Sequence, residues 1–255
     1  MRISETPCDA NIHLSKFKFN CDEIDTSVPK PLSQSLSHFY LICGRPGSSK
    51  TTLCLTMIAK RGKCYNRRFD KVFLWSPSMG SIEDCPLESL PEEQKFEDLT
   101  EANLSAVLED ISGSGEKVLF LMDDVVNDMK KDVHLERLLC KTLMNRRHVC
   151  GSGGGLSVWI TSQVYNKIPL PVRKVASALF LYESKSKAEI DAFYTEVIVG
   201  MTKMEWYQLC KYVWDKRFNF LYIDTTKPFN HMYHKMFNQL HLTTEMDHKM
   251  AADGM

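Results

Sequence analysis

The chain has 255 residues, and its 32 Lys and Arg balance its 32 Asp and Glu, so its formal net charge is zero at pH 7. Hydrophobic residues make up 44% and charged residues 25%, proportions typical of a globular protein with a buried core. The charge balance excludes a histone-like polycation and a permanently basic nucleic-acid coat, although a balanced total can hide local clusters. The length suits one α/β domain or at most two small ones.

Nine cysteines are spread along the chain without a C-x-x-C pair, which argues against a structural zinc site. Their irregular spacing also argues against a disulfide framework, so we expect reduced thiols that fill the core of an intracellular or virion-interior protein. The first residues lead into no apolar segment of the signal-peptide kind, and no apolar run approaches the roughly 18 residues of a membrane helix. The sequence therefore predicts a protein that is neither secreted nor membrane-spanning.

The first 37 residues are polar and predict an extended arm. The apolar run 38–43 then predicts a buried strand that stops at Gly44, and 51–60 predicts a helix. The elements expected after these are, in order, strands at 72–75 and 118–122, an amphipathic helix at 133–148, a flexible glycine-rich loop at 151–155, strands at 156–161 and 178–182, helices around 186–197 and 201–214, and a strand at 218–223.

Strands that alternate with helices predict an α/β fold, in which a mostly parallel sheet carries helices on both faces. The residues from 241 to 255 are polar and predict a frayed tail. The predicted organisation is an arm at 1–37, one domain at 38–240 and a tail at 241–255.

The strongest local signal is a phosphate-binding loop between the first strand and the first helix, Gly44-Arg45-Pro46-Gly47-Ser48-Ser49-Lys50-Thr51, and we extend the predicted nucleotide contacts to Thr52. Small residues let successive backbone N–H groups face phosphates, and the helix N-terminus adds its positive dipole end. Lys50 would reach the β- and γ-phosphates of ATP, and the Thr51 hydroxyl would ligate Mg²⁺. Ser49 departs from the usual pattern, which has glycine there. The alternative is a Gly/Ser turn that happens to precede a helix.

A second signal is the apolar run Lys117–Met122, which ends in the two carboxylates Asp123 and Asp124. A buried strand of this kind would place Asp123 beside the phosphate loop, where it would hold Mg²⁺ through water. Asp124 would polarise the attacking water. The alternative is a solvated strand end or a helix cap, because Asp is common at both.

With these motifs the chain resembles the poxvirus-type genome-packaging ATPases of large DNA viruses, within the FtsK–HerA superfamily of translocating motors. The resemblance extends from about residue 38 to 240. Its further motifs are Asn145-Arg146-Arg147-His148, Trp159-Ile160-Thr161-Ser162-Gln163, Ile168-Pro169-Leu170-Pro171-Val172-Arg173, Asn219-Phe220-Leu221-Tyr222-Ile223-Asp224 and Phe237-Asn238-Gln239-Leu240. Ser49 and the glycine-rich insertion at 151–155 are departures from the family.

The resemblance implies a P-loop NTPase fold of the RecA/ASCE type at 38–240, with ATP and Mg²⁺ as cofactors. It implies a homo-oligomeric ring that acts on double-stranded DNA, with capsid or portal proteins as partners, in the virion or at the assembly site in the host cytoplasm. It also implies that Gln163 lies near the γ-phosphate, where it could hydrogen-bond water or phosphate. An arginine donated across a subunit interface would stabilise the transition-state charge, with Arg147 as first choice and Arg173 as second. The alternatives are a capped strand end for Gln163 and structural or surface roles for the arginines.

The balanced charge conceals a basic segment at 60–71 and an acidic segment at 83–101. Both can be solvated faces. Alternatively, the basic segment, with Tyr65 and Phe69 interleaved, meets a nucleic-acid backbone.

Three functions fit these observations: a DNA-translocating ATPase, a small-molecule or nucleoside kinase, and a non-catalytic protein whose Ser49 marks a degenerate loop. ATPase activity that double-stranded DNA stimulates favours the first, phosphate transfer to a nucleoside the second, and the absence of activity and ATP binding the third.

Overall fold

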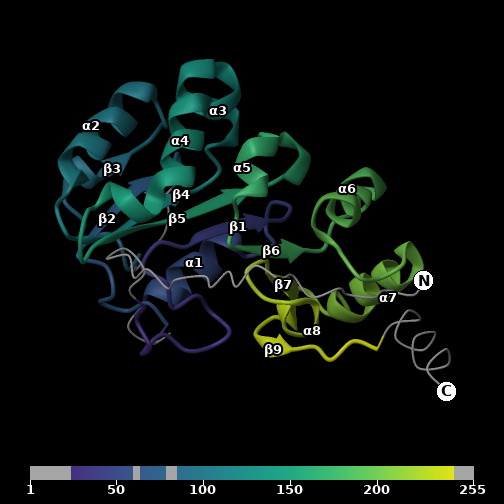
Figure 1. Ribbon diagram of the computed structural model, residues 1–255. Coiled ribbons are helices and arrows are strands. Elements are labelled where there is room, and N and C mark those ends of the chain that lie inside the picture. Colours follow the sequence, from purple (N-terminus) through teal and green to yellow (C-terminus); the bar gives the residue numbers. More distant parts are fainter. Residues whose placement is uncertain (1–23, 60–63, 79–84, 244–255) are drawn as a thin grey trace, which may run out of the picture.

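The computed structural model describes residues 24–59, 64–78 and 85–243 (Figure 1). Its centre is a nine-stranded sheet in the order β3-β2-β4-β5-β1-β6-β7-β8-β9. The strands are β1 (Phe39–Cys43), β2 (Lys71–Trp75), β3 (Lys95–Phe96), β4 (Lys117–Met122), β5 (Gly155–Ser162), β6 (Ala178–Tyr182), β7 (Phe220–Asp224), β8 (Tyr233–Lys235) and β9 (Asn238–Gln239).

The half of the sheet from β3 to β6 is parallel, whereas β7, β8 and β9 are antiparallel additions. The central strands β1, β5 and β6 consist entirely of buried residues, because helices cover both of their faces. The predicted α/β class with a mostly parallel sheet is therefore confirmed.

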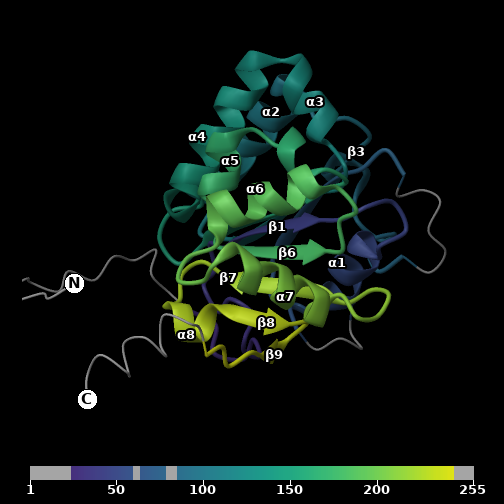
Figure 2. The same ribbon diagram turned by 90° about the vertical axis from the view of Figure 1, so that its right-hand side faces the viewer.

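Two helical layers enclose this sheet (Figures 1 and 2). One core cluster joins the sheet to α2 (Glu101–Ile111), α4 (Val133–Val149), α5 (Leu170–Lys174), α6 (Lys187–Val197) and α7 (Lys203–Val213). The other joins the opposite face to α1 (Lys50–Ile58). The short helices α3 (Val126–Lys131) and α8 (Phe229–Met232) and the 3-10 turns Glu92–Gln94 and Tyr165–Lys167 complete the connections.

Part of the predicted arm packs on the α1 face. Val28 and Leu32 belong to that core cluster, and the Tyr222 hydroxyl donates to the carbonyl oxygen of Pro31 at 3.1 Å. Residues 1–23 of the arm and 244–255 of the tail lie outside the described residues, so the predicted domain boundaries stay a prediction.

The glycine-rich stretch at 151–155 is a short turn between α4 and β5, and its flexibility stays a prediction. Gly155 is the first residue of β5, and both Gly154 and Gly155 are buried. A Cβ on Gly154 would lie 2.5 Å from the carbonyl oxygen of Glu116, which only glycine avoids. The small size of Gly154 therefore lets the chain run close beside Glu116 between the end of α4 and the start of β5.

Among the described residues, no helix combines the length and apolar character needed to cross a lipid bilayer.

Candidate nucleotide-binding site

The phosphate loop leaves β1 at Cys43 and enters α1 at Lys50. The Gly44 N–H donates to the Ser162 carbonyl oxygen at 3.0 Å, which ties the start of the loop to the end of β5. A Cβ on Gly44 would lie 2.7 Å from the Tyr182 Cβ, so the close approach of the loop to β6 requires glycine.

Two residues of the loop adopt left-handed backbone, Gly47 with φ 72° and Ser49 with φ 74°. Alternation of this kind turns successive N–H groups toward one side and builds an anion-binding concavity. Ser49 is also the N-cap of α1, and the first bond of the helix runs from the Leu53 N–H to the Ser49 carbonyl. The amides of Lys50, Thr51 and Thr52 precede that bond and have no acceptor within the helix. Ser49 therefore takes the conformation that the usual glycine would take, at the steric cost of a Cβ.

Lys50 lies inside this loop with only 8% of its surface exposed. Its Nζ donates to the carbonyl oxygens of Gly44 at 2.6 Å and Arg45 at 3.3 Å. Burial lowers the pKa of the ammonium, and the carboxylates of Asp124 and Asp123 partly oppose that effect. The positive charge is thus held within the loop, beside both acids.

Asp123 is the polar centre of the site and is 5% exposed. Its carboxylate accepts hydrogen bonds from the hydroxyls of Thr161 at 2.7 Å, Thr51 at 3.0 Å and Ser76 at 3.5 Å. Mg²⁺ prefers oxygen ligands and is usually held by one or two carboxylates with phosphates and water. The Thr51 hydroxyl and the Asp123 carboxylate, in contact and both oxygen donors, therefore fit a magnesium ion.

Asp124 and Gln163 meet at the tips of the neighbouring strands β4 and β5. Asp124 has a left-handed φ of 59°, its N–H donates to the Thr161 hydroxyl at 3.0 Å, and the Gln163 Nε2 donates to its carboxylate. Burial raises the pKa of Asp124, while the hydrogen bond from Gln163 and the charge of Lys50 act in the opposite direction. A carboxylate with a raised pKa is a better proton acceptor.

Arg147, the first choice for transition-state stabilisation, lies away from these acids. Because β4 and β5 are parallel and α4 connects them, the last turn of α4 lies at the amino-terminal ends of the strands, opposite the phosphate loop at their carboxyl ends. The exposed Arg147 belongs to this turn. Arg147 there lines a cavity of about 720 Å³ together with Ser37 and His38, which precede β1. Arg147 can therefore reach a phosphate loop only in another copy of the chain.

Arg146, which precedes Arg147 in the same motif, and Arg173, the second choice, both make contacts within the chain. Arg146 donates to the carbonyl oxygens of Ser37 at 2.8 Å and Leu143 at 2.7 Å, and so anchors α4. Arg173 forms an ion pair with Glu196 at 3.0 Å and lies 4.7 Å from the Tyr165 ring centroid. Its contacts favour the structural alternative.

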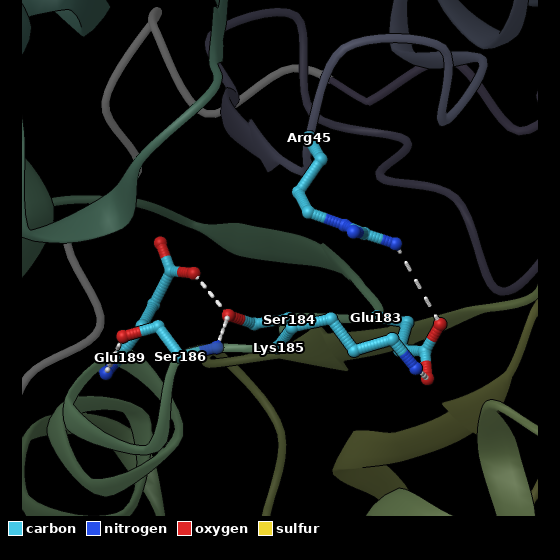
Figure 3. A network of polar contacts seen from close by, with 6 residues as sticks. All are labelled: Arg45, Glu183, Ser184, Lys185, Ser186 and Glu189. Carbon is cyan, nitrogen blue, oxygen red and sulfur yellow. Dashed lines mark hydrogen bonds and ion pairs between the residues drawn. The ribbon is translucent and has the colours of Figure 1, made fainter.

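A polar network links the phosphate loop to the segment after β6 (Figure 3). Arg45 faces Glu183 at 4.0 Å, and the Ser184 hydroxyl, one residue further, donates to Glu189 on α6. Glu189 is 8% exposed and also accepts the Tyr165 N–H at 2.6 Å, two residues after Gln163. The loops after β1, β5 and β6 are thus connected.

Sequence reasoning missed Thr161, Tyr182 and Glu189. Thr161 lies on β5 two residues before Gln163, which follows the strand, so the motif that contains Gln163 also contains Thr161. For Tyr182 and Glu189, no sequence signal separates them from ordinary strand and helix residues.

Of the two aromatic rings in the basic segment, Tyr65 is buried and Phe69 is half-buried, so the Tyr65 ring is not available to a nucleic acid, while the contact of the segment with a nucleic-acid backbone stays a prediction. Tyr65 is 2% exposed and stacks on Phe69, with ring centroids 5.8 Å apart. Lys71 pairs with Asp110 at 3.2 Å, and Arg68 pairs with Asp25 at 3.5 Å. Residues 60–63 of this segment and 83–84 of the acidic one lie outside the described residues. The acidic side chains from Glu88 to Glu101 are exposed, as in a solvated face.

Neither a family model nor a curated protein sequence matches the chain. Its fold matches the genome-packaging NTPase B204 of Sulfolobus turreted icosahedral virus 2, solved with sulfate, with TM-score 0.55 and 13% identity over 81% of this chain and 98% of that one. B204 of the same virus, solved with ATP-gammaS, matches with TM-score 0.53 and 14% identity over 80% of this chain and 99% of that one. The DNA-packaging ATPase B204 of Sulfolobus turreted icosahedral virus gives 0.54 and 13%, over 74% and 93%. These likenesses show a shared fold, so the predicted P-loop NTPase fold is confirmed.

Proposed function

We propose that this chain is an Mg²⁺-dependent ATPase that works as a ring of identical subunits and translocates double-stranded DNA into a viral capsid. The observation that carries the proposal is the convergence of Lys50 with two hydrogen-bonded pairs, Thr51 with Asp123 and Gln163 with Asp124, at the carboxyl ends of the parallel strands. The shared fold with viral packaging ATPases, one of them solved with ATP-gammaS, supports it.

The residues divide the chemistry between them. The loop amides and Lys50 hold the phosphates, and Thr51 with Asp123 holds Mg²⁺, which neutralises charge on the β- and γ-phosphates when bound. Asp124 accepts a proton from the attacking water. Gln163, bonded to Asp124, lies where it can contact that water or the γ-phosphate and transmit hydrolysis to β5.

Ser49 does not argue for a degenerate loop. The residue already occupies the left-handed region that the loop requires, and Lys50 and Thr51 reach their positions with Ser49 in place. We therefore favour an active ATPase over a non-catalytic binding protein.

Hydrolysis in this proposal requires two copies of the chain, because Arg147 lies across the sheet from its own phosphate loop. An arginine from a neighbouring subunit stabilises the charge that develops on the transferred phosphoryl group. We propose Arg147 for this role. We place the assembled ring, with capsid or portal proteins, in the virion or at the assembly site in the host cytoplasm.

ATPase assays with and without double-stranded DNA test the proposal, with Lys50→Ala as the control. Stimulation by DNA is the expected result. Phosphate transfer to a nucleoside would instead identify a kinase, and the absence of both activity and ATP binding would identify a degenerate loop.

A mixing experiment tests the role of Arg147. Arg147→Ala should bind ATP and not hydrolyse it, and Lys50→Ala should do neither. A mixture of the two should recover turnover, because an intact loop then faces an intact arginine at some interfaces. Arg147→Ala assemblies that hydrolyse ATP at the normal rate would remove this assignment.

A further inference from the structure

A second cavity, of about 280 Å³, adjoins the phosphate loop on the side away from the acids. Arg45 to Ser48 form one wall, Tyr182 and Glu183 lie at the end of β6, and the segment 216–219 before β7 forms the other wall. In the sheet order β4-β5-β1-β6-β7, the acids at the tips of β4 and β5 lie on one side of β1, and this cavity lies on the other. None of its residues outside the phosphate loop had been predicted to have a functional role.

The position of the cavity indicates which part of a bound nucleotide would face it, and this step rests on the proposed function. If the terminal phosphate lies beside Asp123 and Asp124, the phosphate chain crosses the loop at Lys50. The ribose and base then leave the loop toward β6 and β7, where the cavity opens.

The segment 216–219 carries an aromatic ring in an unusual position. Phe218 is 45% exposed and has a φ of 70°, a backbone region that bulky residues rarely adopt. The turn is held by the Asn219 N–H, which donates to the Lys216 carbonyl oxygen at 3.2 Å. A strained residue of this kind persists only where its surroundings impose it, and such residues cluster at ligand sites.

The charges around the ring fit a nucleotide. The Arg217 guanidinium lies 4.6 Å from the Phe218 ring centroid, and Lys216 and Arg45 add positive charge along the same cavity. Glu183 supplies carboxylate oxygens that can accept hydrogen bonds from ribose hydroxyls, and aromatic rings stack on bases of any sequence.

We propose that this cavity is the nucleoside subsite, in which the Phe218 ring stacks on the base of ATP. Arg45, in the phosphate loop, faces the phosphate end, Arg217 lies against the Phe218 ring, and Glu183 faces the ribose. The subsite accepts a nucleoside triphosphate by its base, whereas the phosphate loop alone accepts any polyphosphate.

The test uses calorimetry on the full chain in the presence of Mg²⁺. It measures the binding of two ligands, ATP and inorganic tripolyphosphate. Phe218→Asn removes the ring and keeps a residue that tolerates left-handed backbone. Phe218→Tyr keeps the ring and is the matched control. Phe218→Asn should weaken ATP about tenfold, the order expected from the loss of one base–aromatic stack, and leave tripolyphosphate unchanged. Phe218→Tyr should bind both ligands as the wild type does.

The other outcomes separate this proposal from the proposed function. If Phe218→Asn binds ATP normally while Lys50→Ala loses both ligands, the loop holds phosphates but the base lies elsewhere, and the subsite is refuted. Equal weakening of both ligands would also refute it, as would normal ATP binding with weakened DNA binding. A wild-type chain that binds neither ligand would refute the ATPase itself.

Discussion

The buried His38 should make the fold less stable at pH 5 than at pH 7. His38 is 1% exposed and immediately precedes β1. Its Nε2 accepts the Trp159 Nε1–H at 2.8 Å, so the ring proton resides on Nδ1, 2.9 Å from the Ser35 carbonyl oxygen. Burial, with a smaller contribution from the charge of Arg146, lowers the pKa of His38 to about 4 from the ordinary 6.5.

The sign follows from which state binds the proton first. The unfolded chain protonates His38 near pH 6.5, whereas the folded chain resists protonation down to about pH 4, so stability present at pH 7 is lost as the pH falls through this window. For these two pKa values the loss is about 2 kcal/mol between pH 7 and pH 5, and about 3 kcal/mol once the pH falls below both.

Urea unfolding at pH 7 and pH 5 measures this loss in the wild type, in His38→Gln and in His134→Gln. Glutamine does not titrate, so His38→Gln should lose about 2 kcal/mol less than the wild type between the two pH values, whatever its stability at pH 7. His134 is exposed near the start of α4, and its replacement should leave the wild-type difference unchanged. Equal pH differences in the wild type and His38→Gln would refute the reasoning.

Three further predictions concern the site. Asp124→Asn should reduce ATP turnover by about 10²- to 10⁴-fold while calorimetry shows unchanged ATP binding, since only the proton acceptor is lost; normal turnover would assign the water to another residue. Ser49→Gly should raise stability in thermal unfolding by up to about 1 kcal/mol, because relief of the left-handed backbone exceeds the added entropy of glycine. Ser49→Ala, which keeps the strain, should give no gain, and an equal gain would contradict that reason. Gly44→Ala should lose ATP affinity as well as stability, because its Cβ would lie 2.7 Å from the Tyr182 Cβ. The control is Gly153→Ala, whose Cβ meets no atom within 4 Å and which should keep the affinity.

The central part of the fold follows from the sequence because its signals are local. The strands at 118–122 and 178–182 are short apolar runs, and helix α4 has a strong amphipathic pattern, so each was predicted to within one residue of its observed limits. Helix α2 was missed although its signals are local, since Thr100 and Asn103 form a capping box and Leu104, Val107 and Ile111 repeat at helical spacing. Strands β8 and β9 are short and contain few apolar residues, so tertiary packing rather than pattern determines them.

The site divides in the same way. Lys50, Thr51 and Asp123 belong to contiguous motifs whose chemistry requires a strand–loop–helix context, and the structure brings these residues together. Tyr182 and Phe218 reach the phosphate loop from distant parts of the chain, through the pairing of β6 with β1 and β7. Tyr65 shows the opposite error, since proximity to basic residues in the sequence says nothing about which face of a turn a ring occupies.

The two edge strands of the sheet affect how copies of this chain could associate. Its outermost strands, β3 and β9, are two residues long each. Such short edge strands offer too few free N–H and C=O groups for the sheet of another copy to pair with this one. Subunits of an assembly would therefore meet through side chains of helices and loops, without backbone bonds between sheets. Contacts of that kind can separate and reform without disturbing the strands, so subunits could move against each other in every cycle while each sheet stays intact.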